Sequence, residues 1–260
     1  MTAGGALPHR PLPCQGGRHR DNPQDPVRHD LQLPRRRGYR NRDGRTVRTG
    51  RLYRSDSLHR IANADRDVFT ALGVRTVIDL RRPAEVERDG RVPEFDGLSY
   101  RHIHPEHTEW SQRPYQSGDL ARYLADRYAD LARTGTAGLA EAVGLIADSA
   151  NAPVVVHCVA GKDRTGIVCG LTLAVLGVAD DDIAADYALT NEASQRFAAW
   201  LKATFPEADE IPPPFLASPA ETMLLFLAEI REGHGSVENY LRHAGVTDDQ
   251  LTALRTHLLD

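Results

Sequence analysis

The sequence predicts an α/β fold: a central mixed, largely parallel sheet flanked by helices, with a helical lid or appendage near the C-terminal end. The β-branched run Val154–Val156 indicates a buried strand, and a tight loop and an apolar helical pattern follow it directly. Earlier in the chain, short apolar runs typical of strands are interspersed with stretches typical of helices. A chain of 260 residues can bury one sizeable core.

The first half of the chain predicts a hairpin, three strands and three helices. The turn Arg42-Asp43-Gly44 between two extended runs indicates the hairpin, within residues 38–58. Strands are predicted at residues 52–55, 75–81 and 99–104. Amphipathic spacing predicts helices at residues 64–72, 119–132 and 137–147.

The second half is mostly helical after the strand at Val154–Val156. Apolar positions from Arg164 onward predict a helix that begins at the loop, and Asp180 is expected to cap a second helix that ends near residue 202. A proline-rich connector spans residues 206–219, and we expect a helical lid within about residues 200–235. Three further helices are predicted at residues 219–232, 236–244 and 247–259, with Ser236 and Thr247 among their caps.

The stretch that points to chemistry runs from Val154 to Gly166 and reads VVVHCVAGKDRTG. A strand, a tight loop and a helix N-terminus form a geometry that binds anions, because the loop N–H groups converge and the helix dipole adds positive charge. The same groups stabilise a thiolate at Cys158. Five residues separate Cys158 from Arg164, whose guanidinium can hold two phosphate oxygens. A nucleophile, an anion cradle and a clamp together indicate phosphoryl transfer through a cysteinyl-phosphate.

Each residue of the loop has an expected role. Cys158 is the nucleophile, Arg164 binds phosphate and stabilises the transition state, and the Thr165 hydroxyl helps the thiolate leave in the second step. His157 is expected to order the loop by hydrogen bonds. Lys162 adds positive charge at the mouth of the site. The cradle N–H groups come from Val159, Ala160, Gly161, Lys162 and Asp163.

These residues resemble the signature of the cysteine-dependent protein tyrosine phosphatases, which is His-Cys, five residues, Arg, then Ser or Thr. The string HCVAGKDRTG is most similar to bacterial tyrosine and serine phosphatases, the family of a secreted mycobacterial phosphatase of broad specificity. The resemblance covers most of residues 39–260. It implies a catalytic domain at residues 38–260 that hydrolyses phosphotyrosine without a cofactor or a metal. Phosphoserine, phosphothreonine and phosphoinositides are implied as further substrates.

Three carboxylates are candidates for the general acid that protonates the leaving phenolate. Asp79 follows a predicted strand, and a structural role in an ion pair is an equal alternative for it. Glu106 lies in a loop after another strand, and Asp163 lies within the catalytic loop itself. The spacing of Arg81 and Glu85 predicts a surface or bracing pair between them.

Residues 1–37 differ from the rest of the chain. They contain six prolines, seven arginines, three aspartates and no glutamate or lysine, which gives a formal charge of +4. One interpretation is a disordered basic tail. A second interpretation starts from residues 31–37, which read LQLPRRR and precede Gly38 and Tyr39, where members of the resembling family carry a string like NFRDxGGY.

Codons for LQLPRRR, such as CTC CAA CTT CCG CGA CGT CGG, encode SNFRDVG when they are read one base later. The hypothesis is that residues 1–37 are an out-of-frame translation, with an insertion or deletion near the codons of Arg37 and Gly38. If the shifted frame of the gene does not encode NFRD, the hypothesis is wrong. The resemblance implies that the Arg and Asp of that string brace the active site, so their loss makes an inactive phospho-binding pseudo-phosphatase one alternative. A rhodanese-like sulfurtransferase is another.

Composition excludes several other classes of protein. The net charge of −4 gives no indication of nucleic acid binding. Three cysteines form no disulfide framework, which suits a thiolate enzyme in the reducing cytoplasm. The longest apolar stretch, residues 166–179, is too short for stable membrane insertion. No signal peptide is visible, and export without one stays open. The sequence does not predict an oligomeric state.

Overall fold

The computed structural model describes residues 38–61, 64–107, 115–192, 198 and 213–260. The segment 1–37, with its proposed frameshift, therefore lies outside the described residues, as does the part of the predicted connector and lid up to residue 212. The described residues form an α/β fold with a four-stranded sheet in the order β1-β4-β2-β3. The strands are β1 (Leu52–Ser55), β2 (Thr76–Asp79), β3 (Ser99–His102) and β4 (Val154–His157).

All pairings between these four strands are parallel, so the sheet is not mixed as predicted. Antiparallel pairing in the described residues is limited to isolated bridges, which include Arg40 with Thr46 and Val47 with Leu259. The hairpin predicted around Asp43-Gly44 is present beside the sheet as the bridge of Arg40 with Thr46, and Val47 N–H donates to the Tyr39 carbonyl at 2.7 Å across its two arms. Its second arm pairs with the C-terminal end of the chain, because Asp260 N–H donates to the Thr46 carbonyl at 3.0 Å.

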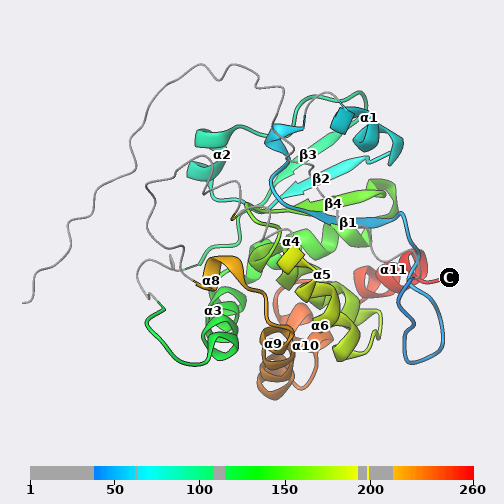
Figure 1. Cartoon of the computed structure of the whole chain (residues 1–260). Helices are drawn as coiled ribbons and strands as arrows, with labels where there is room; N and C mark the ends of the chain where they lie inside the picture. Colours follow the sequence, from blue (N-terminus) through cyan, green and yellow to red (C-terminus); the bar gives the residue numbers. More distant parts are fainter. Residues whose placement is uncertain (1–37, 62–63, 108–114, 193–197, 199–212) are drawn as a thin grey trace, which may run out of the picture.

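Side chains alternate along β4 and so divide the core into two parts. Val154 and Val156 face the larger cluster, which is built with the helices that follow residue 120, whereas Val155 faces a smaller cluster. Phe69 of α1 (Ala64–Ala71) covers that smaller side. Figure 1 shows this asymmetry, with α1 on one side of the sheet and α4, α5 and α11 on the other. All three β4 valines are buried, as expected for a central strand.

The remaining α-helices pack mostly against the larger cluster and against one another. Their bounds are α2 (Pro83–Asp89), α3 (Leu120–Thr134), α4 (Thr136–Ala147), α5 (Asp163–Val175), α6 (Asp180–Ala188), α8 (Pro213–Leu216), α9 (Ala220–His234), α10 (Val237–His243) and α11 (Asp248–Leu258).

Helix caps confirm part of the sequence analysis. Ser236 caps α10 by accepting from Asn239 N–H, and Thr247 forms a capping box with Gln250 at the start of α11. The prediction for Asp180 is wrong, since Ala179 is the N-cap of α6 and Asp180 is its first helical residue. Three aspartates in that first turn still complement the helix dipole.

The carboxyl ends of the parallel strands meet at one edge of the sheet, and this edge carries the candidate site. Ser55, Asp79 and His157 are aligned there in register, and His102 pairs with Asp79 on the next strand. The loop that follows His157 is therefore bordered by the ends of two neighbouring strands. No helix of the described residues is both long and apolar enough to cross a bilayer.

Candidate active site

The loop between β4 and α5 contains Cys158, which is 2% exposed, and ends where α5 begins at Asp163. Its tight path depends on Gly161, which has a φ of +64°. A Cβ at Gly161 would lie 2.5 Å from the Ser55 carbonyl oxygen, so any side chain there would push the loop off β1. Ser57 N–H donates to the Val159 carbonyl at 3.0 Å and holds the same side of the loop.

The buried side chain of Arg54 holds the loop through a hydrogen bond to the loop backbone. Arg54 on β1 donates from Nη2 to the Gly161 carbonyl at 2.8 Å and from Nη1 to Asp186 Oδ2 at 3.0 Å. Tyr39 donates to the other Asp186 oxygen at 2.9 Å. The Asp186 charge raises the pKa of Arg54 against the opposing effect of burial. This network ties β1 and α6 to the backbone of the catalytic loop, a role that the sequence analysis did not assign to Asp186.

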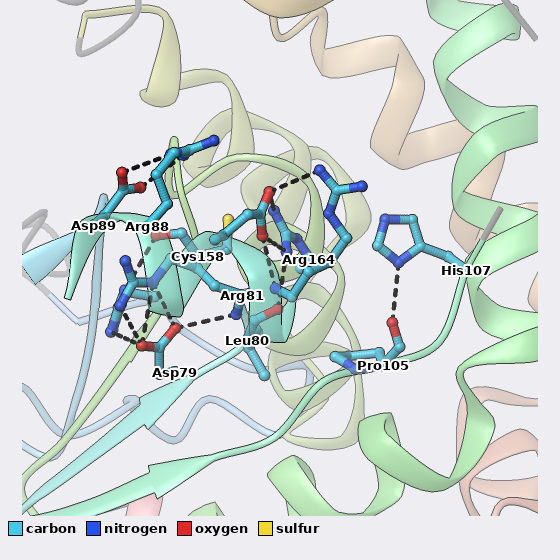
Figure 2. Close-up of polar contacts among 12 residues, drawn as sticks. Asp79, Leu80, Arg81, Arg88, Asp89, Pro105, His107, Cys158 and Arg164 are labelled. Atoms are coloured by element: carbon cyan, nitrogen blue, oxygen red, sulfur yellow. Dashed lines mark hydrogen bonds and ion pairs between the residues drawn. The ribbon is translucent and has the colours of Figure 1, made fainter. Parts of the chain in front are cut away.

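Arg164 stands in the first turn of α5 and is braced by Glu85 of α2. Its Nη1 donates to Glu85 Oε2 at 2.7 Å and to the Leu80 carbonyl at 3.1 Å (Figure 2). Burial alone would lower the pKa of Arg164, but the charge on Cys158 and the bond to Glu85 outweigh it and raise that pKa. The predicted pair of Arg81 with Glu85 is therefore wrong, because the α2 carboxylate reaches across to α5 instead.

Asp79 forms a buried ion pair with Arg81, as Figure 2 shows. Arg81 Nη2 donates to Asp79 Oδ2 at 2.7 Å, Arg81 Nε donates to Oδ1 at 2.9 Å, and Tyr100 OH also donates to Oδ2 at 2.9 Å. Burial would raise the pKa of Asp79, but these bonds prevail and lower it. Asp79 is thus fully buried and ionised, and both of its oxygens accept hydrogen bonds. This environment matches the alternative role for Asp79, that of a structural partner in an ion pair.

His157 lies between this ion pair and the loop. Its Nδ1 lies 3.1 Å from the Cys158 carbonyl oxygen, which can only accept, so Nδ1 carries the proton. Its Nε2 lies 3.5 Å from Asp79 Oδ2. Burial lowers the pKa of His157, although Asp79 opposes that effect. The ring is fully buried, and its ordering role stays a prediction.

The other two candidate acids differ in their surroundings. Asp163 is the first residue of α5, its side chain is 24% exposed, and Tyr128 OH of α3 donates to its Oδ1 at 2.6 Å. Glu106 has an exposed side chain, and its backbone carbonyl accepts from Thr134 Oγ1 at 2.8 Å. Of the three carboxylates, only Asp163 belongs to the loop that carries the nucleophile. Its carboxylate is also partly exposed.

Lys162 is buried and does not lie at the entrance of the site, where the sequence analysis expected it. Its side chain is 1% exposed, and its Nζ donates to the Pro214 carbonyl of α8 at 2.5 Å and lies 3.6 Å from Asp163 Oδ1. Burial lowers the pKa of Lys162, and the Asp163 charge opposes that shift. The short helix α8 therefore covers this side of the loop in the described structure.

Thr165 follows Arg164 in α5 and is fully buried. Its Oγ1 has no hydrogen-bond partner among the described residues. A buried hydroxyl without an acceptor is costly, so it remains available to donate to a group bound in the loop. The role that the sequence analysis expected for Thr165 stays a prediction.

Sequence reasoning missed the groups that support the loop from distant elements. Glu85, Asp186 and Tyr128 come from α2, α6 and α3 and reach the loop only through the fold. Glu85 had been assigned to Arg81. The one usable signal was the Leu52-Tyr53-Arg54-Ser55 run, whose arginine does contact the loop backbone.

Comparison with known proteins agrees with this geometry. The model of the Tyrosine phosphatase family matches residues 37–260. The chain belongs to this tyrosine phosphatase family. It is 32% identical to the Triple specificity protein phosphatase PtpB of Mycobacterium tuberculosis, over 76% of this chain and 86% of that protein. It is 27% identical to a Tyrosine-protein phosphatase of Nostoc commune, over 76% of this chain and 70% of that one.

A solved structure of TpbA from P. aeruginosa aligns with 82% of this chain and 89% of its own, at 15% identity and a TM-score of 0.27. Family membership supports phosphotyrosine phosphatase activity toward phosphoproteins, and it favours neither the sulfurtransferase nor the pseudo-phosphatase alternative.

Proposed function

We propose that this tyrosine phosphatase works through a cysteinyl-phosphate on Cys158. The observation that supports this most is the placement of Arg164, which is held by Glu85 beside the buried Cys158 at the N-terminus of α5. In the first step the Cys158 sulfur attacks phosphorus, and the bond from phosphorus to the tyrosine oxygen breaks. The loop N–H groups of residues 159–163 and the Arg164 guanidinium bind the phosphoryl oxygens throughout.

Asp163 is our choice for the general acid. It protonates the departing phenolate in the first step, and as a carboxylate it accepts a proton from the attacking water in the second. Asp79 is a weaker choice because Arg81 occupies both of its oxygens. In the second step the bond from sulfur to phosphorus breaks, and the Thr165 hydroxyl, which has no partner among the described residues, stabilises the leaving thiolate.

The substrate range is expected to centre on phosphotyrosine in proteins, with phosphoserine, phosphothreonine and phosphoinositides as secondary substrates. We place the enzyme in the cytoplasm, where Cys158 and Cys169 stay reduced, while export without a signal peptide remains compatible with the sequence. The catalytic domain is proposed to span residues 38–260.

Substrate preference can be measured directly by phosphate release. We expect the highest kcat/KM with a phosphotyrosine peptide, a lower value with the same peptide carrying phosphoserine, and a measurable value with phosphatidylinositol 3-phosphate. The reason is that a phenolate leaves more readily than an alkoxide. Equal kcat/KM for all three, or hydrolysis of the lipid alone, would contradict the proposed preference.

The N-terminal hypothesis leads to a second experiment. Exchange of residues 31–37 for SNFRDVG is expected to raise kcat for 4-nitrophenyl phosphate and the melting temperature. The described residues give a reason: an apolar pocket lined by Tyr39, Leu52 and Leu173 adjoins Arg54, whose Nε is buried without a described partner. An aromatic and an acidic residue entering beside Tyr39 complement such a pocket.

The matched control carries SNARAVG, which keeps the length but removes the aromatic and acidic side chains. We expect this control to behave like the chain as written. If the chain as written already has the full activity and stability of the SNFRDVG variant, the string is dispensable and the frameshift has no functional consequence.

A further inference from the structure

The two carboxylate oxygens of Asp163 have different surroundings. Oδ1 accepts from Tyr128 OH at 2.6 Å and lies 3.6 Å from Lys162 Nζ, whereas Oδ2 has no hydrogen-bond partner among the described residues. The side chain is 24% exposed, in contrast to the fully buried Tyr128. One oxygen is therefore held by the protein, and the other is left for a substrate or water.

Tyr128 is itself held in place on several sides. Its ring packs edge-on against Tyr187 and Phe226, each with a centroid separation of 6.0 Å. Its hydroxyl lies 2.7 Å from Tyr187 OH. Tyr187 can approach α5 because residue 166 is a glycine, where a Cβ would lie 2.9 Å from the Tyr187 ring.

The direction of these hydrogen bonds follows from the groups involved. Burial raises the pKa of Tyr128 well above its ordinary value, so its hydroxyl keeps its proton. A carboxylate can only accept, so Tyr128 donates to Asp163. The Tyr128 oxygen is then the acceptor toward Tyr187, whose hydroxyl donates to it. The chain of donors runs from Tyr187 through Tyr128 to Asp163 Oδ1.

We propose that Tyr128, supported by Tyr187, is a positioning residue that occupies Oδ1 of Asp163 and so confines the transferable proton to Oδ2. This inference rests on the proposed function, in which Asp163 is the general acid. With Oδ1 occupied, the carboxyl group presents its O–H to the leaving oxygen in the first step. In the second step the same oxygen takes the proton from water, while the Tyr128 bond stabilises the carboxylate.

The test is the dependence of kcat/KM on the leaving group, because kcat/KM reports only the first step and the second step is the same for every substrate. Tyr128→Phe is expected to lower kcat/KM about 10-fold for phenyl phosphate, a poor leaving group that needs protonation, and to change kcat/KM little for 4-nitrophenyl phosphate. The basic limb of the profile of kcat/KM against pH should move to higher pH, because a carboxylate that loses a hydrogen-bond donor keeps its proton longer. Tyr187→Phe should show the same pattern with a smaller effect.

The matched control is Tyr240→Phe, which removes another buried hydroxyl, one that donates to the Ala132 carbonyl at 2.8 Å. We expect this variant to lower the melting temperature without any dependence on the leaving group. If Tyr128→Phe also lowers kcat/KM equally for both substrates and leaves the pH profile unmoved, Tyr128 is merely structural and the inference is overturned.

Asp163→Asn tests the general acid separately from the positioning role of Tyr128. A steep loss of kcat/KM for phenyl phosphate but not for 4-nitrophenyl phosphate supports Asp163 as the acid of the first step, and the result for Tyr128→Phe then decides the positioning role. If Asp163→Asn shows no such dependence, the assignment of the acid itself is wrong, and the role inferred for Tyr128 is lost with it.

Discussion

Replacement of Cys158 by serine is expected to abolish turnover, with a loss of about 10⁴-fold or more in kcat for 4-nitrophenyl phosphate. A serine hydroxyl is not ionised at neutral pH, and the described residues place no base in hydrogen-bond contact with position 158 to activate it. The loop N–H groups and Arg164 remain, so a phosphotyrosine peptide should still bind. Hydrolysis assays and calorimetric titration of the peptide measure the two effects separately.

Cys169→Ala is the matched control for this experiment. Cys169 is the other cysteine among the described residues, and burial raises its pKa to about 12, so it is not a thiolate at neutral pH. We expect its replacement to leave kcat unchanged and to affect stability only. Residual activity of Cys158→Ser near that of the unaltered chain would rule out the thiolate mechanism.

Arg164→Lys is expected to lower kcat by about 10²- to 10³-fold, which is the usual loss when one donor to transition-state charge is removed. Lysine keeps the positive charge but cannot bind two phosphoryl oxygens with a rigid planar fork. It also loses the paired geometry with Glu85, where the two guanidinium nitrogens lie 2.7 and 3.3 Å from the two carboxylate oxygens. The measurement is kcat with saturating 4-nitrophenyl phosphate.

Glu85→Gln is expected to cause a smaller loss of kcat, because Arg164 keeps its charge and its bond to Leu80 but loses its anionic partner.

Arg231→Lys serves as the control for Arg164→Lys, since Arg231 forms a comparable two-bond pair with Asp180, at 2.6 and 2.8 Å, and has no part in the site. A loss for Arg231→Lys as large as for Arg164→Lys would mean that instability, and not phosphate binding, explains the effect.

The sequence by itself determined the catalytic loop, because everything that defines it is local. A β-branched strand, a glycine where φ is positive and an apolar helix are contiguous, so their order places Cys158 and Arg164 around one anion site. The caps at Ser236 and Thr247 were predictable for the same reason, since a cap and its partner lie three residues apart.

The tertiary structure alone decided which side chains support that loop. Arg164 and Glu85 are 79 positions apart, Asp163 and Tyr128 are 35 apart, and Arg54 and Asp186 are 132 apart. Periodicity shows which face of a helix is buried, but it does not show which distant group that face meets.

The choice among the candidate acids also depends on contacts between residues that are far apart in the sequence. Asp79 and Asp163 are both carboxylates at the edge of a predicted element, and only the fold buries the first against Arg81 and leaves the second partly exposed beside Tyr128. Burial and pairing set the protonation of a carboxylate, and both arise when strand ends and helices far apart in the chain are brought together.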